Sequence, residues 1–155
     1  HQGKKSPISA AVYASIEGRD NFDDTFTENI AGMLGRSFSR YGSVFFAPTV
    51  SINSNPFRNL SSDTKANHTG SFGFGGQFNF RPTGSFLFEY TPRVGYRPDG
   101  SRAQVAFGLQ KRTYRHVFTL TLSNSQGTTT SQYNSGFGGA RKGLTFGFNI
   151  WRRFY

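Results

Sequence analysis

The sequence alternates between bulky apolar residues and small or polar residues over long stretches. Residues 70–81 carry Phe at alternate positions, with Ser, Gly, Gln and Asn between them, and the same phase resumes in residues 86–96 after the segment RPTG. A strict period of two predicts a strand with two different faces. These two segments therefore predict neighbouring strands that share one aromatic face and one polar face.

Six further segments predict strands of the same kind. Residues 8–17, 42–53, 101–112, 115–124 and 143–155 alternate clearly, whereas the pattern in residues 26–39 is weaker. That weaker segment fits a strand with Ile30, Leu34 and Phe38 outward, or a short amphipathic helix capped near Asp24. Its place between two clear strands favours a strand. The eight strands have roughly 10 to 13 residues each, which is the length that crosses a membrane and exceeds that of most globular strands.

The connections between these strands are alternately short and long. The segments 39–42, 81–84 and 112–115 are tight turns, whereas 18–25, 54–69, 96–101 and 125–142 are longer and polar. Short turns on one side and long loops on the other are typical of outer-membrane barrels, in which the short turns are periplasmic. The sequence predicts an all-β fold, an antiparallel up-and-down transmembrane β-barrel that forms a single domain over residues 1–155, with both termini periplasmic.

The phase of each strand assigns its side chains to a lipid-facing or a lumen-lining set. The expected lipid-facing residues are Phe72, Phe74, Phe78, Phe80, Phe86, Phe88, Phe107, Phe118, Leu120, Phe146, Phe148 and Ile150. The expected lumen-lining residues are Glu17, Gln77, Asn79, Glu89, Arg93, Arg102, Gln104, Gln110, Arg115 and Asn149. Tyr90, Val94 and Tyr96 continue the apolar phase after Phe88.

Charged residues on the apolar face occur only near strand ends. Arg36, Lys111, His116 and Arg152 each lie next to a short turn or the end of the sequence, and Glu28 would lie at the opposite rim. An outward cation in the middle of a strand would cost about 2 to 4 kcal/mol in lipid. At the rim, a long side chain can instead extend its charge into the headgroup region.

The C-terminal half resembles a known family. The segments FLFEYTPRVGYRP, VAFGLQKRTYRHVFTLTLSNSQGTTTSQY and GLTFGFNIWRRFY, within residues 69–155, resemble a family of uncharacterised bacterial outer-membrane β-barrel proteins that is defined as a domain of unknown function. The resemblance implies the fold and the location but no activity. Members of the family are longer, so two architectures stay open: an eight-stranded barrel, or the C-terminal part of a wider one.

The last strand also fits the resemblance. Outer-membrane barrels usually finish on an aromatic residue that the insertion machinery reads. Phe148, Ile150, Phe154 and Tyr155 form the expected insertion signal, although Arg152 interrupts the phase. The expected partners are outer-membrane lipid and lipopolysaccharide, the barrel-insertion machinery and other envelope protein subunits.

Composition and charge leave one rival class. The net charge is +10 and 17% of the residues are aromatic, which also fits a soluble, basic, β-rich nucleic-acid-binding protein that uses exposed aromatic rings for stacking. However, an aromatic face that covers about eight strands exceeds the exposed apolar patches of soluble proteins. A soluble lipocalin-like barrel would place its large apolar residues inside instead. We therefore expect a membrane barrel and no nucleic-acid partner.

Candidate chemistry is sparse. The chain has no Cys and only three His residues, His1, His68 and His116, which do not combine into a catalytic or metal-ligating spacing. We expect no enzymatic activity, no metal and no cofactor. The Arg and Glu residues of the lumen, including Arg153, fit either an anion-favouring small pore or a narrow barrel in which they neutralise each other. The second arrangement suits a structural or anchoring subunit.

Overall fold

The computed structural model describes residues 6–18, 26–55, 67–98, 100–127, 129–136 and 143–152. The strands are β1 (Ser9–Gly18), β2 (Phe26–Ser37), β3 (Gly42–Ile52), β4 (Thr69–Arg81), β5 (Gly84–Thr91), β6 (Arg93–Gly95), β7 (Gln104–Arg112), β8 (His116–Ser123) and β9 (Thr145–Arg152). A short helix, α1 (Thr130–Ser135), precedes β9. No helix within these ranges is long and apolar enough to span a membrane.

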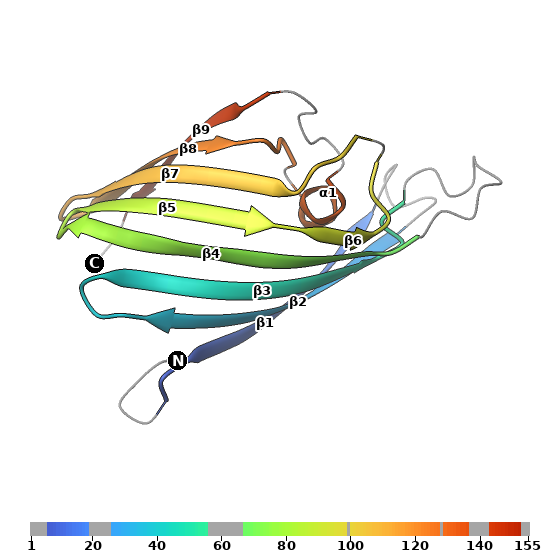
Figure 1. Ribbon diagram of the computed structural model, residues 1–155, viewed down its shortest axis with the longest axis horizontal. Helices are drawn as coiled ribbons and strands as arrows, with labels where there is room; N and C mark the ends of the chain where they lie inside the picture. The colour runs from blue at the N-terminus through green and yellow to red at the C-terminus, as the bar shows by residue number, and fades with distance from the viewer. Residues whose placement is uncertain are drawn as a thin grey trace.

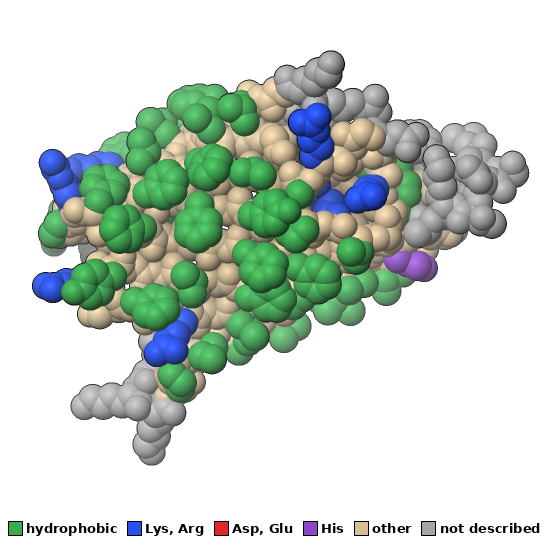
Figure 2. All heavy atoms as spheres, viewed as in Figure 1, with side chains coloured by type: hydrophobic (Ala, Val, Ile, Leu, Met, Phe, Trp, Pro, Cys, Tyr) green, Lys and Arg blue, Asp and Glu red, His purple; other side chains and the backbone are tan. Residues whose placement is uncertain are grey.

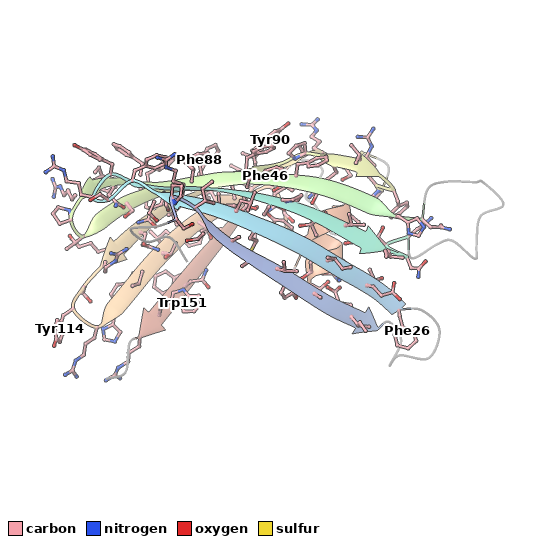
Figure 3. All side chains as sticks on the ribbon, turned by 90° about the horizontal axis from the view of Figure 1, so that it is seen from below. Phe26, Phe46, Phe88, Tyr90, Tyr114 and Trp151 are labelled. Carbon is pink, nitrogen blue, oxygen red and sulfur yellow. The ribbon has the colours of Figure 1, made fainter. Side chains whose placement is uncertain are left out.

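All the strands belong to one antiparallel sheet that curls into a half-barrel (Figures 1 and 3). The order in the sheet is β1-β2-β3-β4-β5-β7-β8-β9, and β6 pairs with β4 beyond the end of β5. Each strand therefore lies beside its neighbour in sequence, as in an up-and-down barrel. The predicted fold class is confirmed, and residues 26–37 form a strand rather than a helix.

The single strand expected over residues 86–96 is divided at Pro92. Proline has no backbone N–H to donate to the ladder, although its carbonyl still accepts from the N–H of Phe72 at 3.1 Å. The strand resumes as β6 and ends at Gly95, whose φ of 85° breaks the alternation. Tyr96 was expected on the apolar face, but it is only 7% exposed, so this prediction was wrong.

Aromatic side chains cover much of the convex face (Figures 2 and 3). Neighbouring strands bring their outward residues opposite one another, so that Phe74 pairs with Phe46 on one side and with Tyr90 on the other. The rings of Phe46 and Phe74 are 4.9 Å apart. Eleven of the twelve residues expected to face lipid are exposed on this face. The twelfth, Phe118, is half-buried and stacks on His116.

Small and polar residues form the concave face. Gly75 gives the clearest reason for a small residue there, because a Cβ at this position would lie 2.5 Å from the ring of Phe45 and 2.8 Å from the carbonyl oxygen of Phe88. Phe45 can therefore lie across the inner surface of β4. The glycine on this face makes room for a neighbouring ring as well as for curvature.

Strands β1 and β9 form the two edges of the sheet, and no pairing joins them in the described ranges. In lipid, an open strand edge would leave backbone groups without hydrogen-bond partners, so spanning sheets are closed. The eight strands of this order, which leaves out β6, alternate in direction. Strands β1 and β9 therefore run antiparallel to each other and have the correct relative direction to pair. Strand β1 begins, and β9 ends, on the side of the short turns (Figure 1).

Two substitutions on β4 test whether the convex face contacts lipid. Phe74→Arg places a cation in the middle of β4, where we expect it to cost about 2 to 4 kcal/mol and to prevent membrane assembly. The matched control is Phe80→Arg, on the same face of the same strand but beside the short turn, where the cost falls to about 0 to 1 kcal/mol. The amount of folded protein in the membrane fraction measures both. Equal insertion of the two variants would contradict the assigned faces.

Candidate functional site: the concave face and helix α1

Helix α1 lies against the concave face, near the strand ends that the longer loops connect (Figure 1). The Thr129 side chain caps its first turn by accepting from the N–H of Gln132 at 3.4 Å. Gly136, in the left-handed conformation with φ of 77°, ends the helix and donates its N–H to the carbonyl of Gln132. The sequence pattern predicts a polar loop over residues 125–142 and gives no sign of this helix.

Helix α1 is attached to three strands by a closed ring of hydrogen bonds. Asn134 donates to Ser51 Oγ at 2.6 Å, and Ser51 donates to Asn29 Oδ1 at 2.5 Å. Asn29 donates in turn to Glu17 Oε1 at 3.0 Å. The ring returns to α1 because the N–H of Ser131 donates to the same oxygen at 3.0 Å, and its hydroxyl donates to Glu17 Oε2. This ring connects α1 with β3, β2 and β1.

Four of the five members of the ring have little contact with solvent, whereas Glu17 is half-buried. Asn29, Ser51 and Asn134 are at most 1% exposed. A buried polar group without a partner costs about 1 to 3 kcal/mol. The ring gives most of the buried polar atoms of its members a hydrogen-bond partner. Displacing α1 would therefore leave several of these atoms without partners. Glu17 was among the expected lumen-lining residues, whereas Asn29, Ser51 and Asn134 were not.

Arg93 attaches the C-terminal end of α1 to β6. Its side chain is 9% exposed, and it donates from Nε to the carbonyl of Asn134 at 2.7 Å and from Nη2 to the carbonyl of Tyr133 at 2.8 Å. Its Nη1 donates to the carbonyl of Arg102. A cation is favourable at a helix C-terminus, where carbonyl groups lack partners within the helix. Arg93 therefore fixes α1 and the segment before β7 together.

Glu89 contacts α1 as well. The hydroxyl of Tyr133 donates to Glu89 Oε1, and Thr91 donates to the same oxygen at 3.3 Å. The lumen carboxylates Glu17 and Glu89 therefore bind hydroxyl, amide and backbone N–H groups. Among the described residues, the hydrogen-bond partners of these two carboxylates come from α1 and from polar side chains of the strands rather than from arginines.

A second polar cluster lies on the concave face nearer the short turns. Gln77 donates to Asn79 Oδ1 at 2.7 Å and to Ser85 Oγ at 3.1 Å, and Asn79 donates to the carbonyl of Arg40 at 3.0 Å. Gln77 of this cluster and Glu89, which binds α1, both line a cavity of 280 Å³, whose lining also includes Phe45, Leu87 and Thr121. The concave face is therefore polar at both ends, with an apolar section between them.

The remaining expected lumen residues lie in several environments. Gln104 is buried, and Gln110 donates to Thr119 at 3.3 Å. Asn149 lies on the edge strand β9 and is exposed. Arg102 and Arg115 are also exposed, and they lie outside the strands because β7 and β8 begin later than the pattern suggested. Arg153, Phe154 and Tyr155 lie outside the described residues, whereas Phe148 and Ile150 lie on the convex side of β9.

The attachment of α1 can be tested through Arg93. Each hydrogen bond from a charged donor contributes about 1.5 to 3 kcal/mol, so Arg93→Ala should accelerate amide hydrogen exchange in residues 129–136 at least about tenfold. Arg102→Ala is the control, because Arg102 accepts through a backbone carbonyl that alanine keeps. Hydrogen–deuterium exchange of the reconstituted protein provides the measurement. Unchanged exchange in Arg93→Ala would show that this side chain does not hold the helix.

Comparison with known proteins gives the family. The model of the family described as "Membrane bound beta barrel domain (DUF5777)" matches residues 1–154. No curated protein and no solved structure matches the chain. The curled antiparallel sheet, its aromatic convex face and its polar concave face agree with the description of the family. The chain therefore belongs to this family of membrane-bound β-barrel domains.

Proposed function

We propose that this protein is a non-enzymatic barrel of the bacterial outer membrane that acts as a structural or anchoring subunit, with a lumen narrowed by α1. The observation that carries the proposal is the buried hydrogen-bond ring through Glu17, Asn29, Ser51, Asn134 and Ser131. A barrel of about eight strands has little internal space beyond its own side chains. A helix fixed on its inner face reduces that space further.

We also propose that β1 pairs with β9 and so closes the barrel. Helix α1 belongs to the connection that leads to β9, yet it binds Glu17 on β1, and Tyr13 on β1 lies 3.3 Å from the hydroxyl of Thr130. These contacts bring the first strand close to the segment before the last one. They support pairing of β1 with β9 in the membrane.

We propose the outer-membrane location and the periplasmic position of both termini from the lengths of the connections between strands. Three short turns lie on the side where β1 begins and β9 ends, and the longer connections join the strand ends of the other side. In outer-membrane barrels the short turns are periplasmic.

The lack of enzymatic activity is proposed because the described His residues have other contacts. His68 accepts from the backbone N–H of Asn53 at 3.3 Å, and His116 stacks on Phe118.

A small pore is the second candidate, and the 280 Å³ cavity lined by Glu89, which binds α1, favours it. That cavity would form part of a path if α1 left the concave face. The polar groups near both ends of the lumen would then contact a permeating solute, as in other selective pores. The two candidates differ in whether α1 stays in place.

The first test is the electrophoretic mobility of the protein, extracted in mild detergent, with and without boiling before SDS electrophoresis. We expect a shift on boiling, because a closed barrel resists SDS until it is heated. Absence of a shift would mean that further strands complete a wider barrel, or that the protein does not form a membrane barrel. Solubility without detergent would identify the second case.

The second test separates the anchor from the pore through planar-bilayer conductance. The wild type should show no stepwise conductance, and replacement of residues 130–135 by Gly and Ser at equal length should introduce it, because the lumen loses its helix. The Arg102→Ala variant serves as control and should behave as the wild type. Stepwise conductance of the wild type, as large as that of the replaced variant, would favour the small pore.

A further inference from the structure

The three short turns carry a cluster of cations, here called the basic rim. Its members are exposed, and they lie on or next to the turns that join β2 to β3, β4 to β5 and β7 to β8. They are Arg36, Arg40, Arg81, Lys111, Arg112 and Arg115. Figure 2 shows Lys and Arg side chains at its left end, where the short turns lie, and a second group nearer its right end.

No described carboxylate side chain lies on these turns. Glu17 and Glu89 bind groups of α1, and Glu28 lies near the start of β2, at the end served by the longer loops. The other acidic residues belong by sequence to longer connections, namely Asp20, Asp23, Asp24, Asp63 and Asp99. The positive charge of the basic rim is therefore not offset by acidic side chains of the same turns.

Three arginines of the rim lie over aromatic rings that are themselves exposed. The pairs, with the distance from the guanidinium carbon to the ring centroid, are Arg36 and Phe38 at 5.3 Å, Arg40 and Tyr41 at 5.1 Å, and Arg115 and Tyr114 at 5.8 Å. Aromatic rings at the edge of a barrel lie at the level of the lipid headgroups. Stacking holds the charged groups at this level, where lipid phosphates also lie.

The guanidinium groups and the ammonium group suit phosphate as a ligand. A guanidinium can donate two parallel hydrogen bonds to a phosphate, and an ammonium group binds it as a point charge. Arg36 and Lys111 share the outward phase of β2 and β7, so they lie beside the lipid-facing residues. The long side chains allow their charges to reach the headgroup region.

We propose that the basic rim binds the phosphate groups of anionic phospholipids in the leaflet next to the short turns. The proposal needs only a membrane-spanning barrel and does not depend on whether the lumen is narrow or open. An acidic protein is the alternative occupant of a basic surface, and the experiment below separates the two. The bound lipids would hold the barrel at a fixed depth and orientation in the membrane.

The test measures lipid selectivity directly. The protein is reconstituted in phosphatidylcholine vesicles with spin-labelled phosphatidylglycerol or spin-labelled phosphatidylcholine as the probe, and electron paramagnetic resonance measures the immobilised fraction of each. At low salt, we expect the wild type to immobilise the phosphatidylglycerol probe about two to three times more strongly than the phosphatidylcholine probe. Because the attraction is electrostatic, high salt should reduce this ratio.

Matched double variants locate the site. The variant Arg36→Gln with Lys111→Gln should lower the ratio towards one, because it removes the two rim cations that lie beside the lipid-facing residues. The variant Arg97→Gln with Arg102→Gln removes the same charge from exposed residues at the opposite end and should keep the wild-type ratio. A wild type without selectivity would overturn the proposal and favour an acidic protein as the occupant. A ratio that the rim variant leaves unchanged would overturn it too, and circular dichroism checks that both variants keep their β-sheet.

Discussion

The structure depends on the requirement that backbone N–H and C=O groups find partners where no water can reach them. In a bilayer, only helices and closed sheets meet this requirement. Within the sheet, the strands meet it by pairing with their neighbours in sequence, in one antiparallel order from β1 to β9. The proposed pairing of β1 with β9 would meet it at the two edges. The period-two pattern then follows, since each strand must present one face to lipid and the other to the interior.

The same requirement gives helix α1 its place. A polar concave face carries side chains that need partners, and the strands alone do not supply all of them. Helix α1 provides an amide from Asn134 and an N–H and hydroxyl from Ser131, and it accepts through its last carbonyls from Arg93. The helix contributes no apolar core. It stabilises the sheet through buried hydrogen bonds, whose loss would leave charged and polar groups without partners.

The sequence predicted the sheet much better than it predicted the site. Alternation of large aromatic and small polar residues is a local signal, so strands, faces and turns could be located from it. Helix α1 has only six residues and no apolar stripe, and its caps at Thr129 and Gly136 lie within a segment rich in Ser, Thr and Gly. Asn29 and Ser51 resemble other small polar inward residues. Their role depends on contacts with Asn134, which lies far along the chain, and alternation carries no information about such contacts.

The closed ring of hydrogen bonds also has a consequence for the order of folding. Glu17 and Ser131 lie 114 positions apart, and Ser51 and Asn134 lie 83 apart. Contacts between such distant residues form late, because the loop between them must first be closed. The ring needs β1, β2 and β3 in register before α1 can join it. Docking of α1 is therefore a late step that can occur only on a correctly paired sheet, and it selects that pairing over a shifted one.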